Sequence, residues 1–239
     1  MKIVICGSTG KMGTLVKKIA GEKNHKVVGE ISGATRDFTD ILKSSEPDIC
    51  IDFSAPAATI KLCESAEIEH IPLVIGTTGL SESDRNIIER HSKHIPILIS
   101  SNFSIGIFLL KKLVKEAADI LPKSFDIEIV EKHHTAKKDA PSGTALSVFD
   151  EIKKSRTDAM AVFGRHGSSL HEAGEVGIHA MRGGNIVGEH DVHFIGQDEE
   201  VKISHVAYDR KIFAAGAILA AERLLKIKTP GLYSMSDIF

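Results

Sequence analysis

Short β-branched runs alternate with helix-like stretches over roughly the first hundred residues, and this rhythm restricts the fold more than any other feature. The runs are nearly continuous in Val and Ile, which is typical of parallel strands covered on both faces. We therefore expect an α/β fold with a doubly wound parallel sheet. Pro56 suits a first helical turn, and Ser81 can cap a helix. The expected strands are 2–6, 26–32, 48–53, 72–75 and 96–100, and the expected helices are 11–20, 57–68 and 81–91.

The pattern changes near Asn102. Residues 105–121 predict one long amphipathic helix, and helical periodicity returns at 212–225. Between them, several stretches alternate with period two, which is typical of a second sheet with one exposed face. Residues 156–174, rich in Gly, Ser and His, are expected to form a mobile loop. The apolar stripe of the long helix is expected to include Leu110, Leu113, Val114, Ala117 and Leu121, and the alternating stretches are 125–131, 175–181, 186–195 and 200–207.

Composition places the chain among ordinary globular proteins. Apolar residues make up 42% and charged residues 26%, a balance that can bury a core and offset the entropy of folding. No apolar run reaches the roughly 18 to 20 residues that cross a bilayer, so no membrane association is expected. The net charge is −2, Trp is absent and only two Tyr occur, so there is no overall positive field for nucleic acid and most stacking platforms for bases are missing.

The cysteines predict a reducing environment. Cys6, Cys50 and Cys63 are odd in number and irregularly spaced, and no C-x-x-C pair occurs. A disulfide framework is therefore not expected, and the expected location is the cytoplasm.

A glycine-rich turn follows the first expected strand and opens the first expected helix. It reads Gly7-Ser8-Thr9-Gly10-Lys11-Met12-Gly13, a G-x-x-G-x-x-G pattern. Glycines let backbone N–H groups approach a pyrophosphate at the positive end of a helix, so the turn predicts dinucleotide binding. A tight turn that binds nothing is the alternative.

The tip of the second strand decides which ribose such a site accepts. An acidic side chain there would hold the ribose hydroxyls of NADH and repel the 2′-phosphate of NADPH. The sequence places Ser32 at the tip, whereas Glu30 reaches the ribose only if the strand ends earlier. Ser32 and Arg36 would both favour a phosphate, so we expect NADPH to be used at least as well as NADH.

Two further loops follow expected strands at the sheet edge where open α/β folds bind ligands. One is Gly76-Thr77-Thr78-Gly79 and the other is Ser100-Ser101-Asn102-Phe103. Ordinary turn chemistry explains either loop alone, but two such loops after successive strands favour ligand contact.

Residues 131–145 carry the densest group of chemically active side chains. They run from an alternating strand through a polar loop into a helix expected to begin near Thr144. Histidine titrates near neutrality and can transfer a proton, while a lysine and a helix start attract a carboxylate. A solvated, charged loop is the alternative. The residues concerned are His133, His134, Lys137, Ser142, Gly143 and Thr144.

The segment E-x-H-H-x-x-K-x-D-A-P-S-G-T-A, which begins at Glu131, resembles the signature of the 4-hydroxy-tetrahydrodipicolinate reductase (dihydrodipicolinate reductase) family. The resemblance spans the chain. It implies NAD(P)H-dependent reduction of 4-hydroxy-tetrahydrodipicolinate to tetrahydrodipicolinate in bacterial lysine and diaminopimelate biosynthesis. The other matching motifs are G-x-x-G-x-M-G at Gly7, I-D-F-S at Ile51, G-T-T-G at Gly76, N-F-S-I-G at Asn102 and R-G-G-N-I-V-G-E-H at Arg182.

The resemblance also implies a division of the chain. Residues 1–104 and 211–239 would form a Rossmann-like dinucleotide-binding domain. Residues 105–210 would form an α+β domain with a mixed open sheet, which binds a small dicarboxylate substrate and assembles a homotetramer.

Roles for individual residues follow from the same resemblance. His133 would donate or accept a proton, and Lys137 would donate one. His134, Gly143 and Thr144 would hold the carboxylates of the substrate. NADPH or NADH would be contacted by residues 7–12, 76–78 and 100–103. Many family members carry an acid where this chain has Ser32, and this departure bears on the choice between the two cofactors.

Two other functions were compared with this one. A semialdehyde dehydrogenase would need a nucleophilic cysteine in a polar loop, and none of the three is so placed. A catalytically silent NAD(P)-sensing regulator would have no need of a proton donor such as His133 or Lys137. A metal site is not expected, since His190 and His193 lie three apart on an expected strand and face opposite ways.

Overall fold

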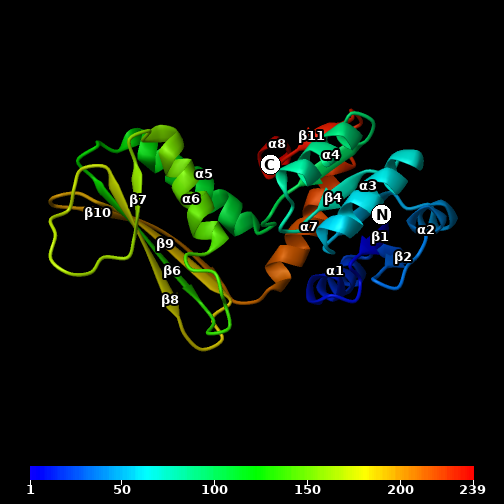
Figure 1. Cartoon of the computed structure of the whole chain (residues 1–239), viewed down its shortest axis with the longest axis horizontal. Coiled ribbons are helices and arrows are strands. Elements are labelled where there is room, and N and C mark those ends of the chain that lie inside the picture. Colours follow the sequence, from blue (N-terminus) through cyan, green and yellow to red (C-terminus); the bar gives the residue numbers. More distant parts are fainter. The chain divides into compact units, whose positions relative to one another are not determined.

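The computed structural model describes all residues 1–239, which form two compact units (Figure 1). One unit combines Met1–Ser104 with Lys211–Phe239, and the other is Ile105–Arg210. A parallel sheet lies in the first unit and a mixed sheet in the second, which confirms the expected fold class. None of the helices combines the length and the apolarity needed to cross a membrane.

The first unit is built on a six-stranded sheet with the order β11-β5-β4-β3-β1-β2, in which all neighbours are parallel. The chain passes from β1 to β2 on one side and then to β3 on the other side of β1. Open α/β sheets bind ligands at such a switch point, beyond the carboxyl ends of the strands. The strands are β1 (Lys2–Cys6), β2 (Lys26–Ile31), β3 (Ile49–Asp52), β4 (Leu73–Ile75), β5 (Pro96–Ile99) and β11 (Gly231–Tyr233).

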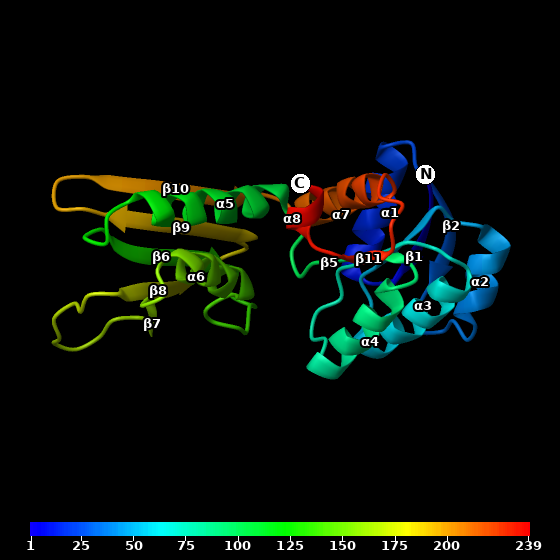
Figure 2. The same ribbon diagram turned by 90° about the horizontal axis from the view of Figure 1, so that it is seen from above.

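Six helices belong to this unit (Figure 2). Pro56 lies in the first turn of α3, and Ser81 caps α4 by accepting a hydrogen bond from the Asp84 N–H, as predicted. Sequence reasoning missed α2, α8 and β11 because each is too short to show a clear hydrophobic period. The helices are α1 (Lys11–Glu22), α2 (Phe38–Ser45), α3 (Pro56–Ile68), α4 (Glu82–Ser92), α7 (Lys211–Leu224) and α8 (Met235–Ile238).

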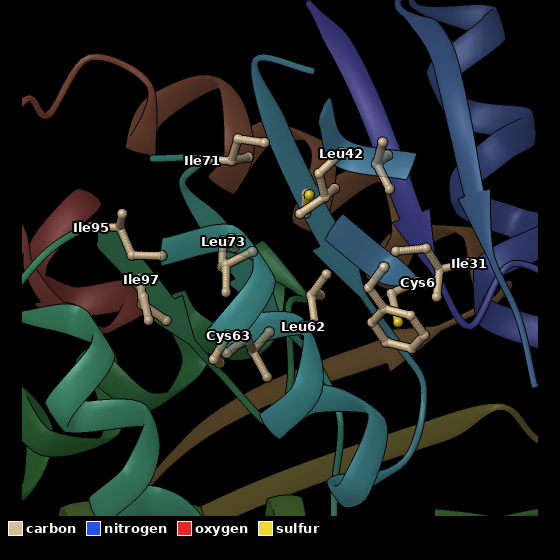
Figure 3. Close-up of a cluster of buried hydrophobic side chains, with 14 of the residues drawn as sticks. Cys6, Ile31, Leu42, Leu62, Cys63, Ile71, Leu73, Ile95 and Ile97 are labelled. Carbon is tan, nitrogen blue, oxygen red and sulfur yellow. The ribbon is translucent and has the colours of Figure 1, made fainter. Parts of the chain in front are cut away.

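The Val and Ile runs are buried on both faces, as a covered parallel sheet requires. In β1, every residue from Ile3 to Cys6 is 1% exposed or less. On one side of the sheet, Leu62 of α3 belongs to the same buried cluster as Leu73 of β4 and Ile97 of β5 (Figure 3).

The three cysteines are buried and unpaired. Burial, with the carboxylate of Asp52 nearby, raises the pKa of the Cys6 and Cys63 thiols to about 12. A shielded, protonated thiol is a poor nucleophile. This environment agrees with the exclusion of a cysteine-dependent dehydrogenase.

The second unit contains a five-stranded mixed sheet with the order β10-β9-β6-β8-β7. Strand β6 is parallel to β8 and antiparallel to β9. Helices α5 and α6 pack on one face and bury Ile127 and Ile129 of β6 with Val114 and Val148. The elements are α5 (Ile105–Ile120), β6 (Asp126–His133), α6 (Gly143–Ser155), β7 (Met160–Phe163), β8 (Glu175–Arg182), β9 (Gly188–Ile195) and β10 (Glu200–Ala207).

Two details of the second unit correct the sequence prediction. Residues 156–174 were expected to form a loop, but β7 lies within them and pairs with β8 at the sheet edge. Leu113 was expected in the buried stripe of α5, yet it is 46% exposed, because the helix buries a narrower face that includes Leu110 and Val114. Both differences arise from packing partners that a local pattern does not reveal.

Replacing Leu62 by Ala should destabilise the first unit by about 2 to 5 kcal/mol, because it opens a cavity in a core where Leu62 is 0% exposed. Urea unfolding measures the loss. Ile68→Ala, on the same helix but 65% exposed, should change the free energy of unfolding by about 0.5 kcal/mol or less. Equal losses for the two variants would contradict this account of the core.

Candidate active site

The loops that follow β1, β3, β4 and β5 meet where their strands end. Phe53, directly after β3, links them. Its ring lies 5.9 Å from the ring of Phe103 in an edge-to-face contact, and its backbone and ring crowd the α-carbons of Gly7 and Gly76. The fold therefore brings together three of the loops that the sequence singled out.

Glycine is required at two points of the turn after β1. Gly7 has a φ of +78°, a conformation that side chains disfavour. A Cβ at Gly7 would lie 2.4 Å from the Phe53 carbonyl oxygen, and one at Gly13 would lie 2.2 Å from the Gly7 carbonyl oxygen. Helix α1 begins after Gly10, and no side chain caps its N-terminus, which is the positive end of the helix dipole.

A buried carboxylate connects two of these loops. Asp52 is 0% exposed and accepts hydrogen bonds from the hydroxyls of Thr59 at 2.5 Å and Thr77 at 2.9 Å. The Ser54 N–H donates to Asp52 and to the Thr77 hydroxyl, each at 3.0 Å. These bonds fix Thr77 in the loop after β4.

The end of β2 distinguishes Glu30 from Ser32. Strand β2 ends at Ile31, whose carbonyl accepts hydrogen bonds from the first two amides of the glycine turn. Both carboxylate oxygens of Glu30 accept from the Lys17 ammonium, at 2.7 and 2.8 Å. Ser32 follows the strand, and its N–H donates to the Thr35 hydroxyl at 3.0 Å. Ser32 therefore lies beyond the strand tip, and Glu30 is engaged elsewhere.

In the second unit, His133 lies at the carboxyl end of β6 beside a buried glutamate. The two atoms His133 Nδ1 and Glu131 Oε2 are 2.6 Å apart, and Glu131 is 0% exposed. Arg182 of β8 forms a two-pronged pair with the same carboxylate at 2.7 and 2.8 Å. Burial opposes the charge of Glu131, but Arg182 and His133 outweigh it and hold its pKa below the usual value.

The start of α6 is tied to this group. Ser142 caps the helix, its hydroxyl accepting from the Ala145 N–H at 3.1 Å, and its own N–H donates to Glu131 at 3.0 Å. Gly143 and Thr144 form the first turn. The predicted helix start is thus confirmed, and it lies beside His133.

His190 of β9 completes the buried polar cluster. Its ring packs edge-to-face on the His133 ring at 5.2 Å, and its Nε2 lies 3.1 Å from the Ser142 hydroxyl. Burial, with the His133 ring nearby, lowers its pKa to about 4, so the ring is neutral at pH 7. His193 lies on the opposite face of the sheet and pairs with Glu200, so the two histidines do not converge.

The remaining predicted residues lie on the loop after β6. Lys137 Nζ donates to Asp139 at 2.8 Å. His134 Nε2 lies 3.1 Å from an Arg210 nitrogen. The loop is anchored by Arg182, which also donates to the Asp139 carbonyl at 2.7 Å. The loop therefore brings Lys137 close enough to act electrostatically on His133, and Asp139 pairs with Lys137 and with the Gly143 N–H.

Comparison with known proteins identifies the family. The profile "Dihydrodipicolinate reductase, N-terminus" matches residues 1–103, and the profile "Dihydrodipicolinate reductase, C-terminus" matches residues 106–239. The chain belongs to the dihydrodipicolinate reductase family. A 4-hydroxy-tetrahydrodipicolinate reductase from Caldanaerobacter subterraneus subsp. tengcongensis is 47% identical, and the match covers 100% of this chain and 98% of that protein. The same enzyme from Staphylococcus epidermidis is 40% identical, with 100% of both chains covered.

Solved structures share the fold of this chain. Dipicolinate-bound dihydrodipicolinate reductase from Paenisporosarcina sp. TG-14 matches with a TM-score of 0.84 at 21% identity, covering 100% of this chain and 99% of that one. Aspartate semialdehyde dehydrogenase II from Vibrio cholerae matches with a TM-score of 0.57 at 11% identity, covering 95% and 99%. At these identities the likeness is one of fold.

Sequence reasoning missed Glu131 and Arg182 as parts of the site. One signal was available. In the period-two pattern of β6, Glu131 shares a face with the core residues Ile127 and Ile129. A charged residue in phase with an apolar face requires a buried partner, but the pattern does not say which.

Proposed function

We propose that this chain reduces 4-hydroxy-tetrahydrodipicolinate to tetrahydrodipicolinate with NADPH or NADH, in bacterial lysine and diaminopimelate biosynthesis. The observation that most strongly supports this proposal is the full-length identity of 47% to a 4-hydroxy-tetrahydrodipicolinate reductase. The substrate must lose water and then gain a hydride at a carbon conjugated to its imine. The chain therefore has to hold two carboxylates and manage one proton.

The first unit is proposed as the dinucleotide-binding domain. Its residues fit a dinucleotide: Gly7 and Gly13 leave no space for a Cβ, and the end of α1 carries no side-chain cap. Residues 7–12 would hold the pyrophosphate, while residues 76–78 and 100–103 would contact the rest of the cofactor. The bound cofactor supplies the hydride.

The second unit is proposed as the substrate-binding domain. The loop and helix start beside His133 offer the ring of His134, the ammonium of Lys137 and the first N–H groups of α6, at Gly143 and Thr144. Such groups suit carboxylates. The related enzyme from Paenisporosarcina sp. TG-14 holds dipicolinate, a dicarboxylate, which supports this assignment. Ser142 would position the helix start through its cap.

The proton is assigned to His133 and Lys137. Loss of water removes a proton from the carbon next to the imine, and the enamine left after hydride addition regains one there. A base that is neutral at rest suits this task. Burial lowers the pKa of His133 even against the opposing effect of Glu131. Lys137 would donate a proton or stabilise the developing charge.

His133→Ala and Lys137→Ala should each lower kcat by about 10²- to 10⁴-fold, the range that general acid–base catalysis contributes. The Kd for NADPH should stay nearly unchanged, since neither residue belongs to the glycine-turn unit. Steady-state kinetics and NADPH titration measure the two effects. Lys138→Ala, at an exposed neighbouring position, is the control and should retain activity. Near-native turnover of either test variant would remove that residue from the chemistry.

We further propose that NADPH is accepted at least as well as NADH. The residue that follows β2 is Ser32, and the carboxylate of Glu30 is paired with Lys17. The exposed Arg36 follows in the same loop, and a guanidinium can pair with a 2′-phosphate at two points.

Ser32→Asp should shift the ratio of kcat/KM values toward NADH, because a carboxylate repels the 2′-phosphate and accepts from ribose hydroxyls. Rates with both cofactors at fixed ionic strength provide the ratio. Ser44→Asp adds the same charge at an exposed position of α2 and should leave the ratio unchanged. A clear preference of the unaltered chain for NADH would refute the assignment of Ser32.

A homotetramer is proposed from the sheet of the second unit. Helices α5 and α6 cover one face, whereas the other face carries paired charges such as Lys132 with Glu189 at 2.6 Å and Lys202 with Asp191 at 3.1 Å. Apolar side chains remain exposed on the same face, and they are Met181, Ile195 and Val206. A mixed charged and apolar face of this kind can pair with a second copy.

Sedimentation equilibrium should give a tetramer at micromolar concentration. Val206→Asp should weaken assembly, because it buries an unpaired charge in the proposed interface. Ile120→Asp, on an exposed position of α5, should leave assembly unaffected. A stable, fully active monomer would contradict the proposal.

A further inference from the structure

Glu131 places a charge at a buried position where the strand pattern predicts an apolar side chain. It lies on the helix-covered face of β6, in phase with Ile127 and Ile129, which belong to the core beneath α5 and α6. Its side chain is 0% exposed. Burying a carboxylate costs several kcal/mol unless its oxygens are well bonded. The groups bonded to Glu131 therefore indicate its role.

Four donors converge on the two carboxylate oxygens. Oε1 accepts from the Arg182 guanidinium at 2.7 Å and from the Ser142 N–H at 3.0 Å. Oε2 accepts from the other prong of Arg182 at 2.8 Å and lies 2.6 Å from His133 Nδ1. The carboxylate is thus ionised and fully bonded. Three of its bonds anchor it to β8 and α6, and the fourth is to His133.

This bond determines the tautomer of His133. An ionised carboxylate only accepts hydrogen bonds, so Nδ1 must carry the proton that joins the two groups. In the neutral ring Nε2 is then left with its lone pair. A base with its lone pair at Nε2 can take a proton from the substrate, whereas the other tautomer presents an N–H there.

Packing also fixes the plane of the ring. The His190 ring lies against it edge-to-face at 5.2 Å. On the same strand β9, a Cβ at Gly188 would lie 3.1 Å from His133 Nε2, so the absence of a side chain there leaves space for this nitrogen. Arg182 reaches from Glu131 to the Asp139 carbonyl and so joins the same carboxylate to the loop of Lys137.

We propose that Glu131 is a positioning residue, which holds His133 in the Nδ1–H tautomer with Nε2 directed toward the substrate, and that Arg182 keeps Glu131 in place. The proposal rests on the proposed function for its catalytic consequence, but the tautomer is a property of the protein alone. A merely structural role of the Glu131–Arg182 pair would affect stability and leave the protonation of His133 unchanged.

Glu131→Gln separates the two possibilities. An amide whose oxygen stays at the Oε1 position keeps one prong of Arg182 and the Ser142 N–H as donors, gives up the other prong and turns its NH₂ toward His133. Nδ1 must then become the acceptor, and the proton must move to Nε2. We expect kcat to fall by about 10²- to 10⁴-fold, with an unchanged Kd for NADPH. Long-range ¹H–¹⁵N spectra of the ¹⁵N-histidine-labelled protein, with His133 assigned through His133→Asn, should show the change of tautomer.

The pH profile gives an independent measure. Glu131 raises the pKa of His133, while burial and the nearby cations lower it, so Glu131→Gln should move the acidic limb of the kcat/KM profile to lower pH. The charged and titratable groups that face His133 or its histidine neighbour are Glu131, Lys137, Arg182, His190 and His205.

Glu67→Gln is the matched control. Glu67 pairs with Nδ1 of His91 on the helices α3 and α4 and takes no part in the proposed site, so kinetics and the His133 signals should not change. The proposal is overturned if His133 of the unaltered protein is protonated at Nε2, a measurement that does not depend on the folding of any variant. It is also overturned if Glu131→Gln folds and retains native kcat. Absence of reductase activity in the unaltered protein, with the Nδ1–H tautomer present, would instead refute the proposed function alone.

Discussion

A parallel sheet must be covered on both faces, and this constraint organises the first unit. Its strands are too apolar to meet water on either side. Between β1 and β5 the chain forms α2, α3 and α4, which pack side by side. Helix α1 has no helix partner from this part of the chain. The chain returns after residue 210, and α7 packs against α1 and the strands β3, β4 and β5. Seven residues of α7 are buried, which explains why this unit is discontinuous in sequence.

The same arrangement positions the loops that are proposed to contact the cofactor. Parallel strands end at one edge, so the turns after β1, β3, β4 and β5 gather there. Close contacts then restrict the side chains. Gly216 of α7 would place a Cβ 1.8 Å from the Phe103 carbonyl oxygen, so the returning helix also presses on the loop after β5. In this unit, the packing of the core therefore also determines where the loops lie.

The second unit differs from the first because it keeps a charged cluster inside a packed layer. Glu131 is bonded to both His133 and Arg182 where the core of α5, α6 and the sheet ends. Their mutual bonds offset the cost of burial. Because His190 is neutral through burial, it adds a polar ring without a further charge. A preorganised, partly dry cluster of this kind is suited to proton transfer.

The sequence alone determined the covered parallel sheet, the glycine turn and the titratable side chains gathered in residues 131–145, because hydrophobic period and residue type are local properties. It also indicated Ser32 at the end of β2. Only the tertiary structure decided that Glu30 pairs with Lys17 and that Glu131 meets Arg182. It likewise decided that β7 joins the sheet edge. These outcomes depend on partners far along the chain, whose distances are set by how strands pair and helices pack.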